Sequence, residues 1–375
     1  MTATVRPSLF TPFRIGPYDL AHRIVMAPLT RMRAGPGNVP RPLNAAYYGQ
    51  RATPGGLIIA EASQVAAHGQ GAPATPGIHS HEQRDGWKGV VDAVHAKGGV
   101  IFLQLWHVGR ISHRSHQPGG GLPIAPSAVR PEGKGMSADW TAQPFETPRA
   151  LEGDEIPGIV AAYRTAADNA KAAGFDGVEI HNANGYLLEQ FLQSRTNLRT
   201  DAYGGTIENR ARLPLEVARA VCDVWGADRV GIRLSPFGVA NDSGEAEPMP
   251  LYSYVIGQLA PLGLAYLHLI EPRASGAGQR EVNHQNVPPG AETFRPLWPG
   301  VLMTAGNFTG DAAEAAVAQN HADAIAFGRY FISNPDLPER LRIGAPLTPY
   351  HRPTFYGGDV AGYTDYAAYA AEAAE

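Results

Sequence analysis

The segment GVEIHNANGYL, residues 177 to 187, joins a short apolar run to a cluster of polar side chains. The run GVEI predicts a buried strand, because valine and isoleucine are enriched in strands. It leads directly into a histidine, two asparagines, a glycine and a tyrosine. A simple stable turn does not require His181, Asn184 and Tyr186 in such close succession, so the segment points to a functional site at a strand end.

Seven further apolar runs of this kind predict an α/β fold with a repeating unit. Helical patterns lie between most of them, for example Trp87, Val90, Val91 and Val94 before Gly98. Eight alternations of strand and helix are typical of a (β/α)8 TIM barrel. We therefore expect residues 1–375 to form a single domain. The strands are predicted at 23–28, 56–63, 100–106, 177–180, 229–236, 265–272, 301–307 and 323–330.

Two segments lie outside this alternation. Residues 110–150 contain six prolines and the triplet Gly119–Gly121, which predicts a lid-like excursion after the third strand rather than a linker. The C-terminal tail YAAYAAEAAE, residues 366–375, predicts a frayed helix.

Composition argues against several classes of protein. Apolar residues make up 44% and charged residues 18%, and the formal charge of −4 offers no extended basic surface for nucleic acid or an anionic membrane. No window reaches the length of a membrane span, and the first twenty residues lack a signal-peptide pattern, so we expect a cytoplasmic protein. The single cysteine, Cys222, excludes an internal disulfide and a cysteine-ligated cluster, and its helical spacing to neighbouring valines predicts a packed core thiol.

The polar residues at the predicted strand ends are the candidates for chemistry, because barrels of this type build their sites there. His181 and Asn184 can direct two hydrogen-bond donors at one oxygen, which polarises a carbonyl or stabilises an enolate. The hydroxyl of Tyr186 can deliver a proton to a developing carbanion. The alternatives are loop capping for the first two residues and a buried aromatic with a satisfied O–H for the third.

The ends of the seventh and eighth strands read AGNFTG and FGRY. Glycine turns at these two positions commonly bind phosphate through backbone N–H groups, and Arg329 adds a matching guanidinium. Tight turns at Gly306 and Gly328 are the competing interpretation. Arg233 lies inside the strand RVGIRLSP, where its burial requires either an anionic cofactor or a structural ion pair.

Several motifs are missing from the chain. No GxGxxG supports a dinucleotide-binding domain. The four lysines, Lys88, Lys97, Lys134 and Lys171, fall on helical or loop stretches, which argues against a Schiff-base aldolase. We expect no metal site, because the loop histidines match no ligand spacing; these are His79, His81, His107, His113 and His116.

Several segments together carry a resemblance to a known family: LFTPFRIG (9–16), RIVMAPLTRMRA (23–34), QLWHVGR (104–110), HNANGYLLEQFLQSRTNLRTDAYGGTIENRARLPLEV (181–217), GNF (306–308) and FGRYFISNPDLPERL (327–341). The chain resembles the old yellow enzyme family of FMN-dependent ene-reductases, especially the bacterial branch that contains pentaerythritol tetranitrate reductase and N-ethylmaleimide reductase. The long central segment is the most specific part of this match.

The resemblance implies a reaction and roles for three residues. FMN would bind across the barrel mouth and be reduced by NADPH or NADH, which leaves before an electron-poor alkene enters the same pocket. The substrates implied are α,β-unsaturated carbonyls, maleimides and nitroalkenes, with nitrate esters as a further class. His181 and Asn184 would bind the substrate oxygen while flavin N5 gives hydride to the β-carbon, and Tyr186 would protonate the α-carbon.

The same resemblance implies the cofactor and substrate contacts. Thr30 would hydrogen-bond the flavin and tune its potential, and the positive charge of Arg233 would lie near flavin N1 and O2. The other implied flavin contacts are Pro28, Leu29, Ala62 and Gln104, the phosphate contacts are Gly306, Asn307, Gly328 and Arg329, and the substrate-pocket walls are Trp106 and Tyr356.

The chain departs from the family pattern at one loop, and two alternative functions stay open. Relatives in this branch often carry a tyrosine in the loop after Gln64, whereas this chain has no aromatic residue between there and Trp87, so substrate shape preference stays open. A flavin-free phosphate-binding isomerase or lyase is one alternative function. A flavin-binding scaffold without turnover is the other. The sequence does not distinguish a monomer from a homodimer.

Overall fold

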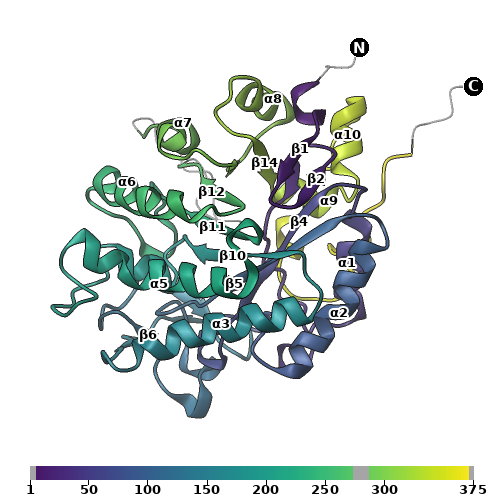
Figure 1. The fold of residues 1–375 in the computed structure, drawn as a ribbon. Coiled ribbons are helices and arrows are strands. Elements are labelled where there is room, and N and C mark those ends of the chain that lie inside the picture. The colour runs from purple at the N-terminus through teal and green to yellow at the C-terminus, as the bar shows by residue number, and fades with distance from the viewer. Residues whose placement is uncertain (1–5, 273–286, 371–375) are drawn as a thin grey trace, which may run out of the picture.

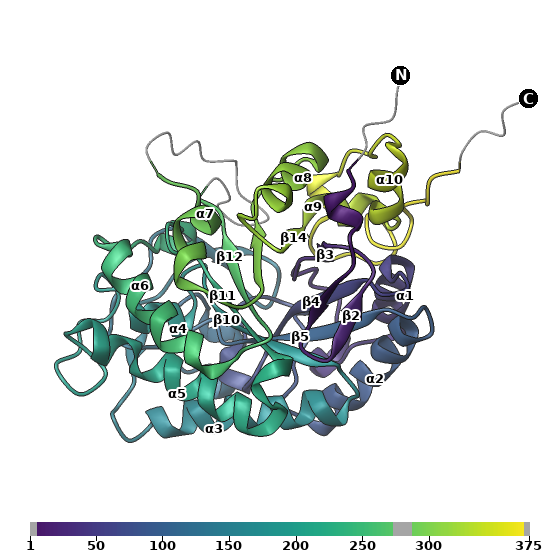
Figure 2. The ribbon, with the colours of Figure 1, turned by 45° about the horizontal axis from the view of Figure 1, so that its top comes forward.

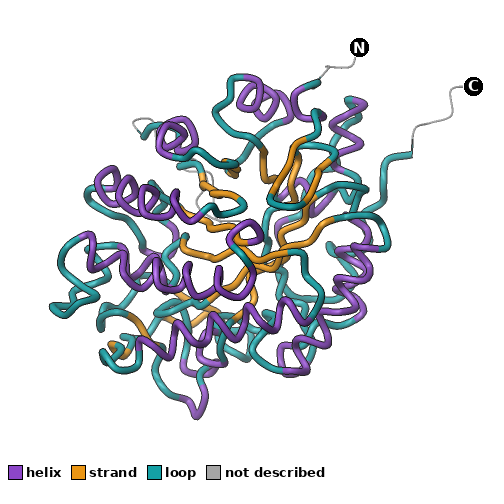
Figure 3. The backbone as a smooth tube through the Cα atoms, in the orientation of Figure 1, coloured by secondary structure: helices purple, strands orange, loops and turns teal. Residues whose placement is uncertain are grey.

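Eight parallel strands close into a barrel at the centre of the computed structural model, which describes residues 6–272 and 287–370 (Figures 1 and 3). Their order around the barrel is β10, β11, β12, β13, β14, β3, β4 and β5. All eight predicted strands and the barrel fold are confirmed. The strands are β3 (Ile24–Met26), β4 (Leu57–Gln64), β5 (Val100–Trp106), β10 (Gly177–Asn182), β11 (Val230–Leu234), β12 (Tyr266–Ile270), β13 (Leu302–Ala305) and β14 (Ala324–Phe327).

Helices surround the strands, as the purple tube around the orange centre of Figure 3 shows. The helix α2 illustrates why they form: Ser80 caps its N-terminus with the side chain of Gln83, and its apolar face is buried against the barrel. Cys222 lies on α5, partly buried against the core, and burial raises the pKa of its thiol to about 11. The helices are α1 (Pro42–Arg51), α2 (His81–His95), α3 (Ile156–Ala172), α4 (Leu187–Leu192), α5 (Ile207–Trp225), α6 (Pro248–Leu259), α7 (Gly290–Phe294), α8 (Gly310–Ala318), α9 (Arg329–Ser333) and α10 (Leu337–Ile343).

The N-terminal end of the barrel is closed by a hairpin of β1 (Phe13–Ile15) and β2 (Tyr18–Leu20). Its apolar side chains join those that fill the barrel interior, and the Tyr18 ring packs edge-on against Phe102. Figure 2 shows the purple strand β2 of this hairpin on the same side of the molecule as α8 and α10. With one end closed by apolar packing, the opposite, C-terminal end of the strands is left for a site.

The pairing register of the barrel strands places polar residues of neighbouring strands side by side. In the β10–β11 pair His181 lies opposite Arg233, and in the β11–β12 pair Arg233 lies opposite His268. In the β10–β5 pair Glu179 lies opposite Gln104. Side chains from several strands therefore converge near one end, as expected for a barrel whose site is assembled from strand termini.

The excursion after the third strand is confirmed. Residues 110–150 form a parallel pair, β6 (Ile124–Ala125) with β9 (Arg149–Ala150), and an antiparallel hairpin, β7 (Lys134–Met136) with β8 (Ala142–Pro144). The segment lies beside the mouth of the barrel, because Lys134, Gly135 and Phe145 reach the cavity described below.

The prediction of a helix in the C-terminal tail is wrong for residues 366–370, which have no regular secondary structure; residues 371–375 lie outside the described part of the chain. The tail forms hydrogen bonds with α10 and its N-cap residue instead of the hydrogen bonds of a helix. The backbone N–H of Tyr369 donates to the carboxylate of Asp336 at 2.7 Å, and Arg340 donates to the carbonyl of Ala367 at 3.0 Å. Within residues 6–272 and 287–370, no helix has the length and apolar character needed to cross a bilayer.

Candidate functional site

A cavity of about 520 Å³ opens at the C-terminal ends of the strands, and every residue predicted for the site lines it. The walls come from the strand ends, from the excursion and from the segment after α10. This arrangement brings the residues together; their chemical roles remain predictions. The predicted residues that line the cavity are Pro28, Leu29, Thr30, Ala62, Gln104, Trp106, His181, Asn184, Tyr186, Arg233, Gly306, Asn307, Gly328, Arg329 and Tyr356.

Buried His181 and half-buried Tyr186 lie together at the β10 end. Burial lowers the pKa of His181 well below its usual value, and the charge of Arg233 lowers it further, so the imidazole is neutral. Its Nδ1 has no hydrogen-bond partner among the described residues. Burial raises the pKa of Tyr186 to about 12, so its phenol stays protonated at neutral pH. The site thus contains a neutral imidazole and an intact phenolic proton side by side.

Asn184 sits in a left-handed turn that directs its side chain to the cavity. Its φ is 58°, which asparagine tolerates better than most residues. The backbone N–H donates to Ser235 Oγ at 2.8 Å, and the carbonyl accepts from Asn241 Nδ2 at 2.9 Å. At Gly185, where φ is 75°, an added Cβ would lie 2.7 Å from the carbonyl oxygen of Ala240. Only glycine therefore fits this close approach of two loops.

The buried carboxyl of Glu189 stabilises the turn at Asn184 and Gly185 through hydrogen bonds. It accepts hydrogen bonds from Ser235 Oγ and Tyr252 Oη, both at 2.6 Å, and from the backbone N–H of Gly185. Burial raises its pKa to about 7, and the three hydrogen bonds limit that rise. The backbone N–H of Asn184 donates to Ser235 Oγ, and the backbone N–H of Gly185 donates to Glu189 itself. Glu189 therefore fixes both residues of the turn, Asn184 through Ser235 and Gly185 directly.

Arg233 is buried at the cavity without an ion pair formed by the described residues. The nearby carboxylate of Glu179 is already used, since it accepts from Gln104 Nε2 at 2.7 Å and pairs with His268 Nδ1 at 2.8 Å. Burial lowers the pKa of Arg233, and Glu179 partly offsets this. Arg233 Nε has no hydrogen-bond partner within residues 6–272 and 287–370. The arrangement disfavours the structural ion pair and leaves a buried positive charge that an anionic ligand can satisfy.

The turns after β13 and β14 lie together on the other side of the cavity. Gly306 and Asn307 both have positive φ, 143° and 54°, and Arg329 Nη2 donates to Asn307 Oδ1 at 2.8 Å. At Gly328 a Cβ would lie 3.2 Å from the Leu29 side chain, so the Leu29 side chain packs closely on the Gly328 backbone. Two glycine turns beside a guanidinium fit a phosphate group. With Arg233 across the cavity, the residues fit a phosphate-bearing cofactor with an anionic ring, such as FMN.

Sequence reasoning missed several residues of the cavity. Lys134 was assigned to a loop, but it lies on β7 at the mouth, near Phe145. Asn241 also lines the cavity and hydrogen-bonds Asn184. The sequence contains a weak signal for Asn241, because the polar run Asn241–Asp242–Ser243 follows the fifth predicted strand. This run, which follows a Gly-Val-Ala stretch, matches no motif that would mark Asn241 as a site residue.

Two of the histidines predicted in loops contact other protein groups, whereas His81 is the first residue of the helix α2. His107 pairs with Nδ1 of His68 at 2.8 Å and accepts from the backbone of Gly109 at 3.0 Å. His116 lies 2.7 Å from the carbonyl of Met136. Among the residues that the structure describes, no group of three His, Cys, Asp or Glu side chains could hold a metal ion.

Comparisons with known proteins agree with this geometry. The model of the NADH:flavin oxidoreductase / NADH oxidase family matches residues 8–348. Putative 12-oxophytodienoate reductase 11 of Oryza sativa subsp. japonica is 48% identical over 361 residues, which cover 96% of each protein. 12-Oxophytodienoate reductase 2 of Arabidopsis thaliana is 47% identical, covering 96% of this chain and 95% of the relative.

Solved structures resemble the whole barrel. Morphinone reductase in complex with tetrahydroNAD superposes with a TM-score of 0.90 at 52% identity, covering 96% of this chain and 98% of that one. The old yellow enzyme homologue from Zymomonas mobilis gives a TM-score of 0.90 at 41% identity, covering 96% and 99%. The chain therefore belongs to the NADH:flavin oxidoreductase / NADH oxidase family and is an oxidoreductase of the old yellow enzyme type, an FMN flavoprotein built on a TIM barrel.

Proposed function

We propose that the protein is an NAD(P)H-dependent ene-reductase that reduces the C=C bond of electron-poor alkenes. The observation that carries this proposal is the grouping of neutral His181, Asn184 and protonated Tyr186 around one cavity. The names of the relatives are consistent with it, since they are reductases of 12-oxophytodienoate and of morphinone. The substrate class comprises α,β-unsaturated carbonyls, maleimides and nitroalkenes, and extends to nitrate esters.

The donors of His181 and Asn184 act on the oxygen of the substrate. A neutral imidazole has one N–H and the carboxamide has two, so together they can bind one carbonyl or nitro oxygen. Donors that are fixed before the reaction stabilise the negative charge that develops on this oxygen as the alkene is reduced. The turn that holds Asn184 is braced by Ser235 and Glu189, so little reorganisation is needed.

Tyr186 supplies the proton that completes the reduction. Its raised pKa keeps the phenol protonated, and a carbanion next to a carbonyl is basic enough to accept the proton. Its ring is held edge-on by Trp106, with ring centroids 5.0 Å apart. Trp106, Phe145 and Tyr356 line the cavity around this phenol.

The remaining cavity residues would bind the cofactor. FMN, when bound, supplies the redox chemistry that couples NAD(P)H oxidation to alkene reduction. Pro28, Leu29, Thr30, Ala62, Gln104 and Arg233 would hold its ring, and Gly306, Asn307, Gly328 and Arg329 its phosphate. The buried charge of Arg233, which lacks a protein carboxylate of its own, is the feature that favours a ring able to carry negative charge.

Product analysis tests the proposal. The purified protein, loaded with FMN, is incubated anaerobically with NADPH or NADH and 2-cyclohexenone, and the organic extract is analysed by gas chromatography. The proposal predicts cyclohexanone in amounts equal to the nicotinamide oxidised. Nicotinamide oxidation without cyclohexanone contradicts ene-reduction, and a protein that does not retain FMN favours the phosphate-binding isomerase or lyase instead.

A further inference from the structure

Asn241 contacts the turn that carries Asn184, one of the residues to which substrate binding is assigned. It lies in the 3-10 turn Ala240–Asp242 after β11 and lines the cavity. Its Nδ2 donates to the backbone carbonyl of Asn184 at 2.9 Å. Asn241 also lies near Tyr186, where it lowers the pKa of the phenol against the larger effect of burial.

The backbone at Asn241 is held in an unfavourable conformation. Asn241 and Asp242 are consecutive left-handed residues, with φ of 57° and 56°. Single residues of these types visit this region, but such conformations persist only where the surroundings hold them. The close approach of Ala240 to Gly185 leaves this loop little freedom to shift relative to the Asn184 turn.

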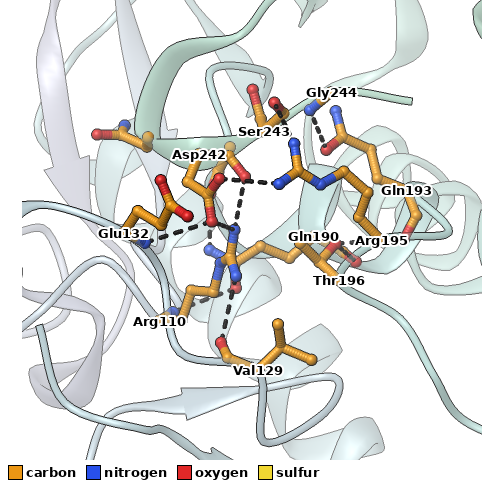
Figure 4. Close-up of polar contacts among 12 residues, drawn as sticks. Arg110, Val129, Glu132, Gln190, Gln193, Arg195, Thr196, Asp242, Ser243 and Gly244 are labelled. Atoms are coloured by element: carbon orange, nitrogen blue, oxygen red, sulfur yellow. Dashed lines mark hydrogen bonds and ion pairs between the residues drawn. The ribbon is translucent and has the colours of Figure 1, made fainter. Parts of the chain in front are cut away.

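Asp242 provides the anchor, and Figure 4 shows it between the guanidinium groups of Arg110 and Arg195. Arg110 is almost fully buried and donates to the Asp242 carbonyl at 2.8 Å. Arg195 donates to the Asp242 carboxylate at 3.0 Å, and the backbone N–H of Glu132 does so at 3.3 Å. Arg110 also donates to the carbonyl of Val129 at 3.2 Å, so the anchor ties the loop to the excursion over the mouth.

We propose that Asn241, anchored through Asp242, is a positioning residue that orients Asn184 for alkene reduction. The inference rests on the proposed function. Fixing the carbonyl of Asn184 fixes the adjoining peptide plane and hence the direction of its side chain.

Asn241→Gly removes the carboxamide without straining the backbone, because glycine accepts positive φ. The matched control is Asn320→Gly, since Asn320 has φ of 59° and is exposed beyond the end of α8, away from the cavity. In anaerobic stopped-flow experiments on the FMN-loaded protein, we expect Asn241→Gly to slow reoxidation by 2-cyclohexenone roughly tenfold. Reduction by NADPH should change less than about twofold, and the control should match the wild type in both steps.

A double-mutant cycle separates positioning from general loosening of the fold. In an Asn184→Gly background, the effect of Asn241→Gly on reoxidation should shrink, because the residue it positions is gone. Equal loss in both backgrounds, or wild-type reoxidation in Asn241→Gly, overturns the inference. Should Asn241→Gly fail to retain FMN, Asn241→Asp keeps the size and the left-handed conformation, removes the donor and must show the same selective loss. A wild-type protein that enone does not reoxidise contradicts the proposed function itself, and the inference falls with it.

Discussion

The Tyr186 ring packs edge-on against the imidazole of His181, with ring centroids 5.1 Å apart and planes at 84°. The contact places the protonated phenol beside the neutral imidazole in one buried corner of the cavity. Their neighbour Asn184 completes a short segment of chain to which the proposed function assigns two donors and an acid. The tests below therefore separate oxygen binding, proton transfer, cofactor binding and turn stability.

Removing the oxygen-binding donors should impair only the alkene step. We expect His181→Ala combined with Asn184→Gly to retain FMN but to slow enone-dependent reoxidation on the order of a hundredfold, because pre-oriented donors are lost. Apparent affinity for the enone should fall as well. Stopped-flow absorbance with varied 2-cyclohexenone measures both effects, and unchanged enone kinetics would falsify the donor-pair assignment.

Tyr186→Phe should separate proton delivery from cofactor reduction. The ring and its packing on Trp106 are kept while the acid is lost, so we expect alkene reduction to slow on the order of a hundredfold. Reduction by NADPH should remain within about threefold of the wild type. If the variant instead loses NADPH reduction and keeps alkene turnover, Tyr186 has a different role.

Replacing Arg233 should weaken cofactor binding. Arg233→Gln removes a buried charge that forms no ion pair with a described carboxylate and is only partly offset by Glu179, so we expect the FMN dissociation constant to rise about tenfold or more. Fluorescence of released FMN on dialysis measures this constant. Arg212→Gln, which alters an exposed arginine on the outer face of α5, is the control and should bind FMN as the wild type does. Equal FMN affinity in Arg233→Gln and the wild type would contradict the assigned contact.

Glu189 should give the fold a specific pH dependence. Its pKa is raised from 4.5 to about 7, so folding favours the protonated carboxyl. Its stabilising contribution is therefore full below about pH 4.5 and is lost as the pH rises through about 7, a change on the order of 3 kcal/mol. Urea unfolding at several pH values should show Glu189→Gln losing less stability than the wild type across this window. Parallel pH profiles for the two proteins would refute the burial argument.

The strands and the polar residues at their ends, such as His181 and Arg329, could be predicted because each depends on a local pattern. The resemblance to a known family, not a local pattern, supplied the other cavity residues, such as Thr30 and Gln104. Apolar runs such as GVEI define strands. Barrel geometry then brings the C-terminal ends of the strands together independently of the sequence of the connecting loops. The C-terminal tail was mispredicted since its alanines favour a helix, whereas the structure bonds its backbone to Asp336 and Arg340, far away in sequence. Lys134 and Asn241 were missed for a similar reason, because only tertiary packing brings the excursion and the β11 loop to the mouth.

The central claim, that this cavity couples nicotinamide oxidation to alkene reduction, is tested most directly by a sequential anaerobic stopped-flow experiment. The FMN-loaded protein is mixed first with NADPH and then with 2-cyclohexenone, and absorbance is followed in the visible flavin band. The account predicts bleaching in the first step and enone-dependent return of colour in the second, with the return slowed in Tyr186→Phe. Bleaching that enone does not reverse, in a protein that still holds FMN, would contradict the account and favour a flavin-binding scaffold without turnover.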